Sequence, residues 1–417
     1  MLQKLRLSLL SLLAILSCDY AQAGEFRSKG IFFKTISADQ VEVVDALNQS
    51  SLWDVEIPET VSNEGKNYKV VGIARYACDG NNSIKSVSIP NSVTTIGECA
   101  FMGCCNLEAI NIPNSVKSIG DEAFRMCQNM KSATIGNGVK DFGACLFMKC
   151  EKLTSVTIAD GATAIGDACF NDCIELVSAT IPNSVKNIGQ YAFYDCKNLE
   201  VIDLPNELTS IGQCAFYGCI KASSIAIPSN VKTIGRYAFA FCHNLSSITV
   251  DKDNQYFNSQ NNCNAIIETA TDKLLIGCRT TVIPDGVEKI GNGAFYGCIY
   301  LPTITLPSSV TTVENLAFAN CFFMSAITVQ NTTPPGSYAD AFVNMNATLF
   351  VPYSSKTVYK QAEGWKELMK IEEMQPSGIA TIESNASPSS LFDMNGRQLS
   401  KSIRGINIIN GRKVFKK

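Results

Sequence analysis

The residues with the greatest capacity for chemistry in this 417-residue chain are its 18 cysteines. Stacked repeats would bring neighbouring cysteine Cα atoms near bonding range, but their Cβ vectors would run parallel rather than toward each other. A free cysteine behaves as a small buried hydrophobe. We therefore expect a ladder of mostly free thiols, while the scattered Cys105, Cys263 and Cys278 leave a disulfide open. Nine cysteines occupy one position of the repeat: Cys104, Cys127, Cys150, Cys173, Cys196, Cys219, Cys242, Cys298 and Cys321.

Catalytic and metal-binding patterns are almost absent. His243 is the one histidine, and we expect it to be a solvated turn residue. A single histidine rules out a His-rich zinc site and leaves little room for a His-based triad. The chain has no phosphate-binding loop, no dinucleotide fingerprint and no H-E-x-x-H motif. The sequence therefore predicts a protein that is not an enzyme and needs no cofactor, although hydrolysis by carboxylates alone stays open.

A polar insertion, residues 251–264, lengthens one repeat of the chain. Asp251, Asp253 and Asn254 resemble the start of a calcium loop, but no glycine or distal glutamate follows at EF-hand spacing. We therefore expect a solvated loop and no metal. Insertions into repeats form loops that often lie on a working face, so this segment is also a candidate part of a binding surface.

Five tyrosines flank the position of a recurring phenylalanine and are candidate ligand-binding residues: Tyr191, Tyr194, Tyr217, Tyr237 and Tyr296. Tyrosine is enriched in binding interfaces. Successive repeats should place Tyr194 and Tyr217 side by side, about one strand spacing of ~4.8 Å apart. Aromatic side chains beside a core position can also simply lean over that core, and the sequence leaves both interpretations open.

The element that must position these residues is a repeat of 23 residues, which runs through residues 89–249 and again through residues 283–328. A period in this range indicates a solenoid. Leu107, Ile110 and Ile112 have the spacing of a short strand with apolar side chains inward. Ala123-Phe124-x-x-Cys127 predicts a tight helical turn with these side chains inward. One such coil cannot bury its apolar side alone, whereas stacked coils share a continuous core.

Three positions of the repeat are almost invariant along the chain. Cysteine follows phenylalanine by three residues in all nine full repeats. Glycine precedes the phenylalanine by four residues in eight of them, and the exception is Glu314. Burial of one phenylalanine contributes about 1.5–3 kcal/mol, so a stacked column should stabilise the whole axis. The predicted core phenylalanines are Phe101, Phe124, Phe147, Phe170, Phe193, Phe216, Phe239, Phe295 and Phe318.

The repeat I-P-x-S-V-x-x-I-G-x-x-A-F-x-x-C-x-x-L-x-x-I-x closely resembles the BspA-like leucine-rich repeat proteins of bacterial surfaces. The resemblance covers about Val71 to Pro352. It implies a leucine-rich repeat solenoid that is not an enzyme. It also implies an adhesin on the cell surface, or a secreted one, whose partner is a host matrix protein, a glycan or another cell. The alternative is a structural spacer without a specific ligand.

The N-terminus predicts export. Lys4 and Arg6 precede an apolar run that is too short to span a bilayer, and Ala21-Gln22-Ala23 is a well-formed cleavage site. We therefore assign residues 1–23 to a signal peptide. The stretch ending at Cys18 resembles a lipobox, so a lipid anchor at Cys18 is an alternative. The formal net charge of −3 gives no basic footprint for nucleic acid.

The remaining segments are predicted to complete the solenoid of residues 67–352. Residues 24–66 should form an N-terminal β cap, because terminal coils need a polar cover. Residues 353–374 should form a C-terminal capping helix, followed by a linker at 375–390. The predicted inward face of that helix comprises Val358, Ala362, Trp365, Leu368 and Ile371.

Residues 391–417 should form short strands joined by Asn-Gly turns. This β tail resembles, in shortened form, the C-terminal sorting tails of proteins secreted by Bacteroidetes. That resemblance implies a Gram-negative cell and a location in the outer membrane or outside it. The alternative is a small structural β appendage.

Overall fold

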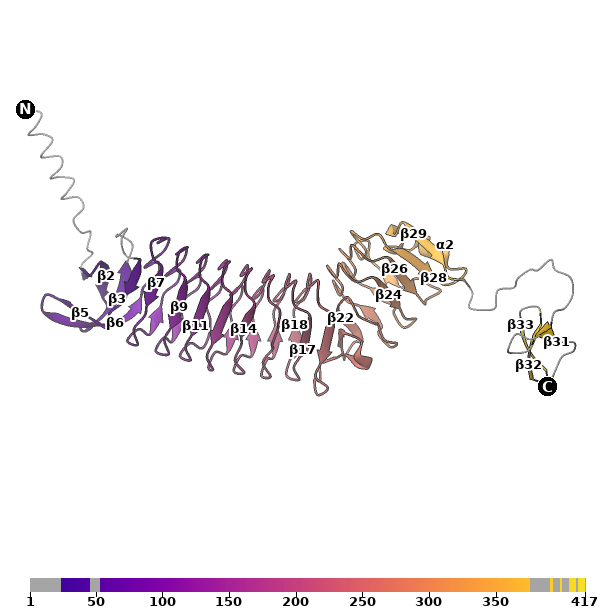
Figure 1. Ribbon diagram of the computed structural model, residues 1–417, viewed down its shortest axis with the longest axis horizontal. Helices are drawn as coiled ribbons and strands as arrows, with labels where there is room; N and C mark the ends of the chain where they lie inside the picture. Colours follow the sequence, from indigo (N-terminus) through magenta and orange to yellow (C-terminus); the bar gives the residue numbers. More distant parts are fainter. Residues whose placement is uncertain are drawn as a thin grey trace, which may run out of the picture.

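The computed structural model describes residues 24–45 and 53–375, and the strand residues 391–392, 398–399, 405–409 and 412–416. The predicted signal peptide, Cys18 and nearly all of the predicted linker lie outside the described residues. Figure 1 shows an elongated stack of coils, with the strands of successive coils side by side along the whole length. The predicted solenoid is therefore confirmed.

The first described residues form antiparallel strands at the N-terminal end of the stack, where we predicted a β cap. β3 then pairs in parallel with β6, and β6 pairs with a strand of the first coils, so one sheet extends from this end into the stack. That these strands cap the core remains a prediction. The strands are β1 (Glu25–Ser28), β2 (Ile31–Thr35), β3 (Gln40–Asp45), β4 (Asp54–Glu56), β5 (Thr60–Asn63) and β6 (Lys66–Ile73).

Each regular coil contributes strand segments that pair in parallel with those of the next coil. Ile135 pairs with Ile158, one repeat away, and both are buried. The Ser and Thr residues that alternate with buried residues in the same two strands face outward. One row contains β7 (Ser86–Ser88), β9 (Ala109–Ile112), β11 (Ser132–Ile135), β12 (Ser155–Ile158), β14 (Ser178–Thr180), β17 (Ser224–Ile227) and β19 (Ser247–Val250). The other contains β8 (Thr95–Ile96), β10 (Ser118–Ile119), β13 (Ala164–Ile165), β15 (Asn187–Ile188), β16 (Ser210–Ile211) and β18 (Thr233–Ile234).

The predicted helical turn around each core phenylalanine is wrong. Glu122 and Met126 have φ angles of 59° and 61°, in the left-handed region that a helix does not contain. The amide of Glu122 donates to the carbonyl of Ala144 at 2.8 Å, and the amide of Phe124 donates to that of Leu146 at 3.0 Å. Because these hydrogen bonds join neighbouring coils, the turns form a third ladder along the axis, beside the two strand rows, rather than separate helical turns.

The glycine position of the repeat is explained by close contact between coils. At Gly212, an added Cβ would lie 2.5 Å from the Gly189 carbonyl carbon and from the Gln190 amide nitrogen. Both are backbone atoms, which cannot move aside as a flexible side chain could. A larger residue would therefore push the two coils apart.

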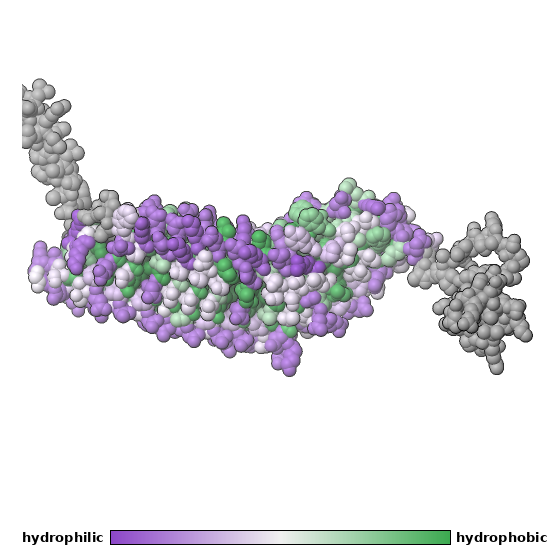
Figure 2. Space-filling view, viewed as in Figure 1, coloured by the Kyte–Doolittle hydropathy of each residue, from purple (hydrophilic) through white to green (hydrophobic). Residues whose placement is uncertain are grey.

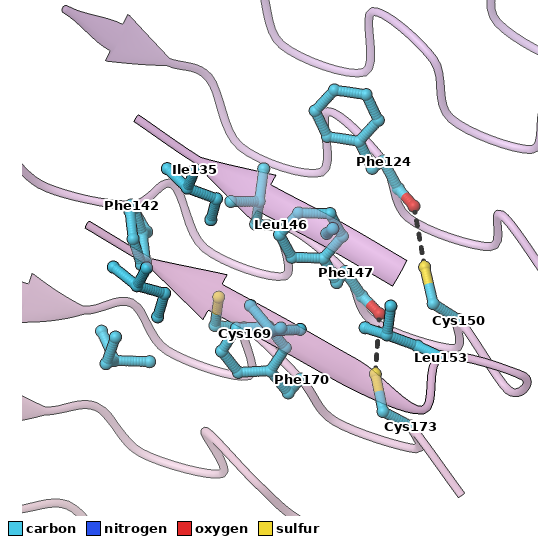
Figure 3. Packing of buried hydrophobic residues seen from close by; sticks show 14 of the residues in the cluster. Phe124, Ile135, Phe142, Leu146, Phe147, Cys150, Leu153, Cys169, Phe170 and Cys173 are labelled. Carbon is cyan, nitrogen blue, oxygen red and sulfur yellow. Dashed lines mark hydrogen bonds between the residues drawn. The ribbon is translucent and has the colours of Figure 1, made fainter. Parts of the chain in front are cut away.

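The phenylalanine and cysteine positions form the centre of the core (Figure 3). The rings of Phe124 and Phe147 stack at 5.5 Å, and those of Phe147 and Phe170 stack at 5.6 Å. The Sγ of Cys150 donates to the Phe124 carbonyl at 3.2 Å, and the Sγ of Cys173 donates to the Phe147 carbonyl at 3.2 Å. Cysteine is thus more than a small hydrophobe here, because its thiol gives a second donor to a buried carbonyl.

The 17 cysteines within the described residues are free. Those of the ladder point at carbonyls of the preceding coil rather than at each other. Burial raises the pKa of the Cys104 thiol to about 12, so it is protonated at neutral pH. The other cysteines for which a disulfide stayed open also have local partners, since Cys278 Sγ donates to the Asn264 carbonyl at 3.4 Å.

We expect most ladder thiols to be alkylated when the protein is denatured without reductant. In the native protein they should react slowly, because burial and protonation both suppress the thiolate. Mass spectrometry after alkylation, with a reduced sample as the fully labelled control, measures both states. Disulfides among Cys127, Cys150, Cys173 and Cys196 would contradict the thiol-to-carbonyl arrangement.

The segment that follows β19 begins with the insertion of residues 251–264, which is mostly exposed and irregular, and continues as a further piece of sheet. It contains β20 (Phe257–Asn258), η1 (Gln260–Asn262), β21 (Ala265–Glu268) and β22 (Lys273–Gly277). β21 and β22 pair antiparallel, and β22 then pairs in parallel with β23 (Lys289–Ile290). Figure 1 shows the regular stack interrupted at β22, with the following coils offset from it. The buried core divides into two clusters at the same point.

The predicted solvated loop at the start of this insertion is wrong for Asn254, which is 8% exposed. Its Nδ2 donates to the carbonyls of Pro228 and Val231 at 2.8 and 3.0 Å. Its Oδ1 accepts from the amides of Tyr256 and Phe257, both at 2.8 Å. Asn254 therefore holds the insertion against the preceding coil, a structural role that its polar neighbours concealed in the sequence.

The stack continues through β24 (Thr303–Leu306), β25 (Thr312–Val313), β26 (Ala326–Val329), β27 (Gly336–Ser337) and β28 (Thr348–Val351). The predicted capping helix at 353–374 is mostly wrong. Only α2 (Lys356–Gln361) is α-helical, and it is followed by η2 (Trp365–Glu367) and the strand β29 (Lys370–Glu373).

Gly364 and the sheet explain why the helix ends early. Gly364 has a φ of 74°, and an added Cβ would lie 2.6 Å from the Tyr338 carbonyl oxygen. After it, Ile371 joins the parallel sheet opposite Leu349. Trp365 is buried as expected, but Val358, predicted to face inward, is 46% exposed.

The tail contains β30 (Leu391–Phe392), β31 (Gln398–Leu399), β32 (Gly405–Ile409) and β33 (Arg412–Lys416). These four strands pair antiparallel in one small sheet. Short strands were predicted here, and whether they serve as a sorting signal remains a prediction.

Candidate functional site

The turns beside the core phenylalanines carry a continuous row of aromatic side chains, which we call the aromatic stripe. It contains the five predicted tyrosines, all half-buried, and four aromatic residues that were not among the predicted binding residues. The ring contacts connect these residues across successive coils, beginning with Tyr191 against Tyr194 at 5.8 Å. The stripe comprises Tyr191, Tyr194, Tyr217, Tyr237, Phe241, His243, Tyr296, Tyr300 and Phe323.

Tyr194 and Tyr217 lie side by side, as their spacing predicted. Their ring centroids are 4.7 Å apart, and their planes differ by 3°. Such stacking covers one face of each ring, so the pair presents mainly its edges and hydroxyl groups. Burial raises the pKa of both phenols above the ordinary value, so both remain neutral hydrogen-bond donors well above physiological pH.

Phe241 connects the early tyrosines to those beyond the insertion. Its ring lies 5.0 Å from Tyr217 and 5.1 Å from Tyr296. Its φ of 57° is left-handed, at a turn position that Gly218 and Gly297 occupy in other coils. An added Cβ on Gly297 would lie 2.5 Å from the Phe241 ring, so that glycine makes room for the contact.

The C-terminal end of the stripe is its most exposed part. Tyr300 and Phe323 are 48% and 67% exposed, and their rings stack at 5.8 Å. Phe322, which borders the stripe beside Phe323, is 54% exposed. Tyr300 and Phe323 share a position with polar residues of other coils: Asn106, Asn129, Lys152, Asn198 and Asn244. That change from polar to aromatic is the sequence signal that could have revealed them. Figure 2 shows apolar residues gathered at the upper edge of the C-terminal coils.

His243 is not the solvated turn residue that we predicted. It is half-buried between aromatic rings, 5.8 Å from Phe241 and 6.2 Å from Tyr300. Burial lowers its pKa below the ordinary value, so the imidazole is neutral at pH 7. The stripe therefore gains no positive charge from this residue.

The stripe combines exposed apolar rings with phenol hydroxyl groups. Large exposed apolar patches on soluble proteins mark interaction sites. Within the described ranges, no group of three or more His, Cys, Asp or Glu residues is arranged to hold a metal ion. No helix in those ranges has the length and apolar character needed to cross a bilayer.

Comparison with known proteins identifies similar solenoids. The sequence model described as "BspA type Leucine rich repeat region" matches residues 71–200, 163–273 and 275–387. No curated protein matches the chain.

Two solved structures share the fold. A leucine-rich cell surface protein from Faecalibacterium prausnitzii is 23% identical, with a TM-score of 0.56 over 87% of this chain and 97% of the other. A leucine-rich repeat protein from Bacteroides ovatus is 26% identical, with a TM-score of 0.54 over 84% of this chain and 100% of the other.

Proposed function

Because the chain belongs to the BspA-type leucine-rich repeat family, we propose that it is an exported, non-enzymatic binding protein and a surface adhesin. Its partner is an extracellular protein or a glycan of host matrix or of other cells. The family and the description of one structural neighbour as a cell surface protein support a surface or secreted location. The predicted signal peptide, with a lipid anchor at Cys18 as the alternative, and the β tail support export from a Gram-negative cell.

One observation carries the binding role: the exposed aromatic end of the stripe. Tyr300 and Phe323 place large apolar surfaces in water at a turn position where other coils have polar residues, and Phe322 exposes a third ring beside Phe323. Exposure of such rings opposes solubility and contributes nothing to the buried core. Aromatic anchors supply much of the energy of protein interfaces, which gives these three residues a reason to be exposed.

The rest of the stripe supplies a longer and weaker surface. Half-buried tyrosines such as Tyr194 and Tyr217 are already ordered by stacking, so they lose little conformational entropy on binding. A partner that lies along several coils would add many such contacts. The insertion begins one coil after the coil of Tyr217, and we include residues 251–264 as a flanking part of the surface.

The spacer alternative rests on a different face. The outward residues of the sheet, such as Ser132, Thr134, Ser155 and Thr157, are small, polar and exposed. A solvated face of this kind needs no ligand. A protein that bound no matrix protein, glycan or cell surface in a broad screen would favour the spacer over the adhesin.

We expect the double variant Tyr194→Ala with Tyr217→Ala to weaken adhesion to the partner by about threefold to tenfold, or roughly 0.7–1.4 kcal/mol. The effect is modest because only ring edges and hydroxyls are presented and other contacts remain. The measurement is adhesion to immobilised matrix proteins and glycans, after melting has been shown to be unchanged. Undiminished adhesion would place the contact away from this part of the stripe.

A further inference from the structure

A polar pocket lies where the stack of coils is interrupted. In the regular stack, the Asp195 amide donates to the Tyr217 carbonyl at 2.8 Å. Across the interruption, the corresponding turns are joined by a longer hydrogen bond of 3.4 Å, from the Phe241 amide to the Tyr296 carbonyl. β22 enters the stack here, and a cavity of about 210 Å³ opens beside it. This volume suits a single small polar molecule.

Four separate segments line this pocket with polar groups. Arg236 and Tyr237 come from the turn after β18, Lys273 comes from β22, and Asn292 and Glu314 come from the next two coils. The Tyr237 hydroxyl donates to Asn292 Oδ1 at 2.9 Å. The Glu314 carboxylate accepts a hydrogen bond from the backbone amide of Asn292 at 2.9 Å and forms an ion pair with Lys273 at 3.1 Å. The lining is therefore held in place before any ligand binds.

The sequence departs from the repeat at the positions that make this lining. Glu314 occupies the position that is glycine in the other eight repeats, and its carboxylate lines the cavity. Lys273 belongs to the stretch that interrupts the period of 23. Gly293 has a φ of 63°, and an added Cβ would lie 2.3 Å from the Tyr237 ring, so glycine there makes room for that ring.

The charges favour a ligand that carries one negative group and several hydroxyls. Arg236 is exposed and, among the described residues, takes part in none of the six ion pairs. Its guanidinium lies over the Tyr237 ring at 6.0 Å and can bind a carboxylate with two parallel hydrogen bonds. Asn292, Lys273 and Glu314 together offer donors and acceptors, as a hydroxyl group requires of its partners.

We propose that this pocket binds a sugar residue that carries a carboxylate. The carboxylate pairs with Arg236, and the ring hydroxyls bind Asn292, Lys273 and Glu314. This inference rests on the proposed binding function and names a glycan as one of its ligands. Tyr237 belongs to both the pocket and the aromatic stripe, so a glycan held in the pocket can continue along the exposed rings.

The test compares D-glucuronic acid with D-glucose, which differ by the carboxylate alone. Calorimetry or ligand-observed NMR on the full chain should show about millimolar affinity for glucuronic acid, as expected of a monosaccharide, and about tenfold weaker binding of glucose. The Arg236→Gln variant should bind glucuronic acid about tenfold more weakly and leave glucose unchanged. The Glu314→Gln variant should weaken both sugars.

Arg75→Gln is the matched control. Arg75 occupies the same position of the first coil, next to Tyr76, but it pairs with Glu98 at 3.4 Å in the regular part of the stack. It should not change binding. Equal affinity for the two sugars, or no binding of either, overturns the pocket proposal. Neither result affects adhesion through Tyr300 and Phe323, which is measured separately, so the two proposals can fail independently.

Discussion

Phe193→Ala is expected to lower the free energy of unfolding by about 3–5 kcal/mol. Phe193 is fully buried, and its ring stacks on Phe170 at 5.1 Å and on Phe216 at 5.2 Å. Removal of the ring takes away its transfer free energy and both stacking contacts, and leaves a cavity that neighbouring coils cannot fill without breaking their hydrogen bonds. Chemical unfolding monitored by circular dichroism measures the change.

Lys197→Ala is the matched control in the same coil. Lys197 is exposed, four residues after Phe193, and its truncation should change stability by no more than about 0.5 kcal/mol. Equal effects of the two substitutions would show that the phenylalanine column does not form the core. A mid-stack position is the best place for this comparison, because the coils on both sides are regular.

The repeat made the fold predictable because every coil has to satisfy the same packing. Phe193, Cys196 and Gly212 stand at positions where each coil contacts the next, so the same residue type recurs along the axis. Inward strand residues such as Ile135 followed from the same periodicity. What periodicity could not supply was backbone conformation, since Glu122 and Met126 adopt left-handed turns that ordinary helix patterns do not distinguish.

The segments that break the repeat were predicted least well. The apolar spacing of residues 353–374 fits a helix, but Gly364 ends it and Ile371 finds a partner in the sheet. The hairpin of β21 and β22 was missed because its polar beginning suggested a loop. Both errors have one cause: the open edge of a neighbouring coil provides strand partners that local sequence does not show.

The repeat predicted the fold well, but the exposed residues of the candidate site lie where the chain departs from the repeat. The predicted tyrosines were found because they flank the repeated phenylalanine, yet Tyr194 and Tyr217 largely cover each other. The most exposed rings, Tyr300 and Phe323, lie where the chain departs from its own pattern. Repeat positions that keep the same residue type in every coil therefore reflect packing. Positions where one coil has a different residue type are the better candidates for a function specific to this chain.

The triple variant Tyr300→Asn, Phe322→Lys and Phe323→Asn is expected to reduce adhesion about 100-fold, or roughly 2.7 kcal/mol. Each new residue already occurs at the same position of other coils, as in Asn129 and Lys197, so the fold should tolerate it. The loss should be large because these three side chains provide the most exposed aromatic surface at the C-terminal end of the stripe.

The control removes exposed apolar side chains from elsewhere in the chain. Val201 and Met369 are 65% and 88% exposed, and the double variant Val201→Thr with Met369→Gln should adhere like the wild type. It separates the loss of a specific contact from a general decrease in surface hydrophobicity.

Adhesion of the wild type and the triple variant to the same panel of matrix proteins, glycans and cells is the most direct test of the binding role. The account predicts that the wild type binds at least one member, that the triple variant loses most of that binding, and that melting of the two proteins is the same. Equal binding by the two folded proteins would contradict the aromatic stripe as the contact surface, and no binding by the wild type would contradict the adhesin.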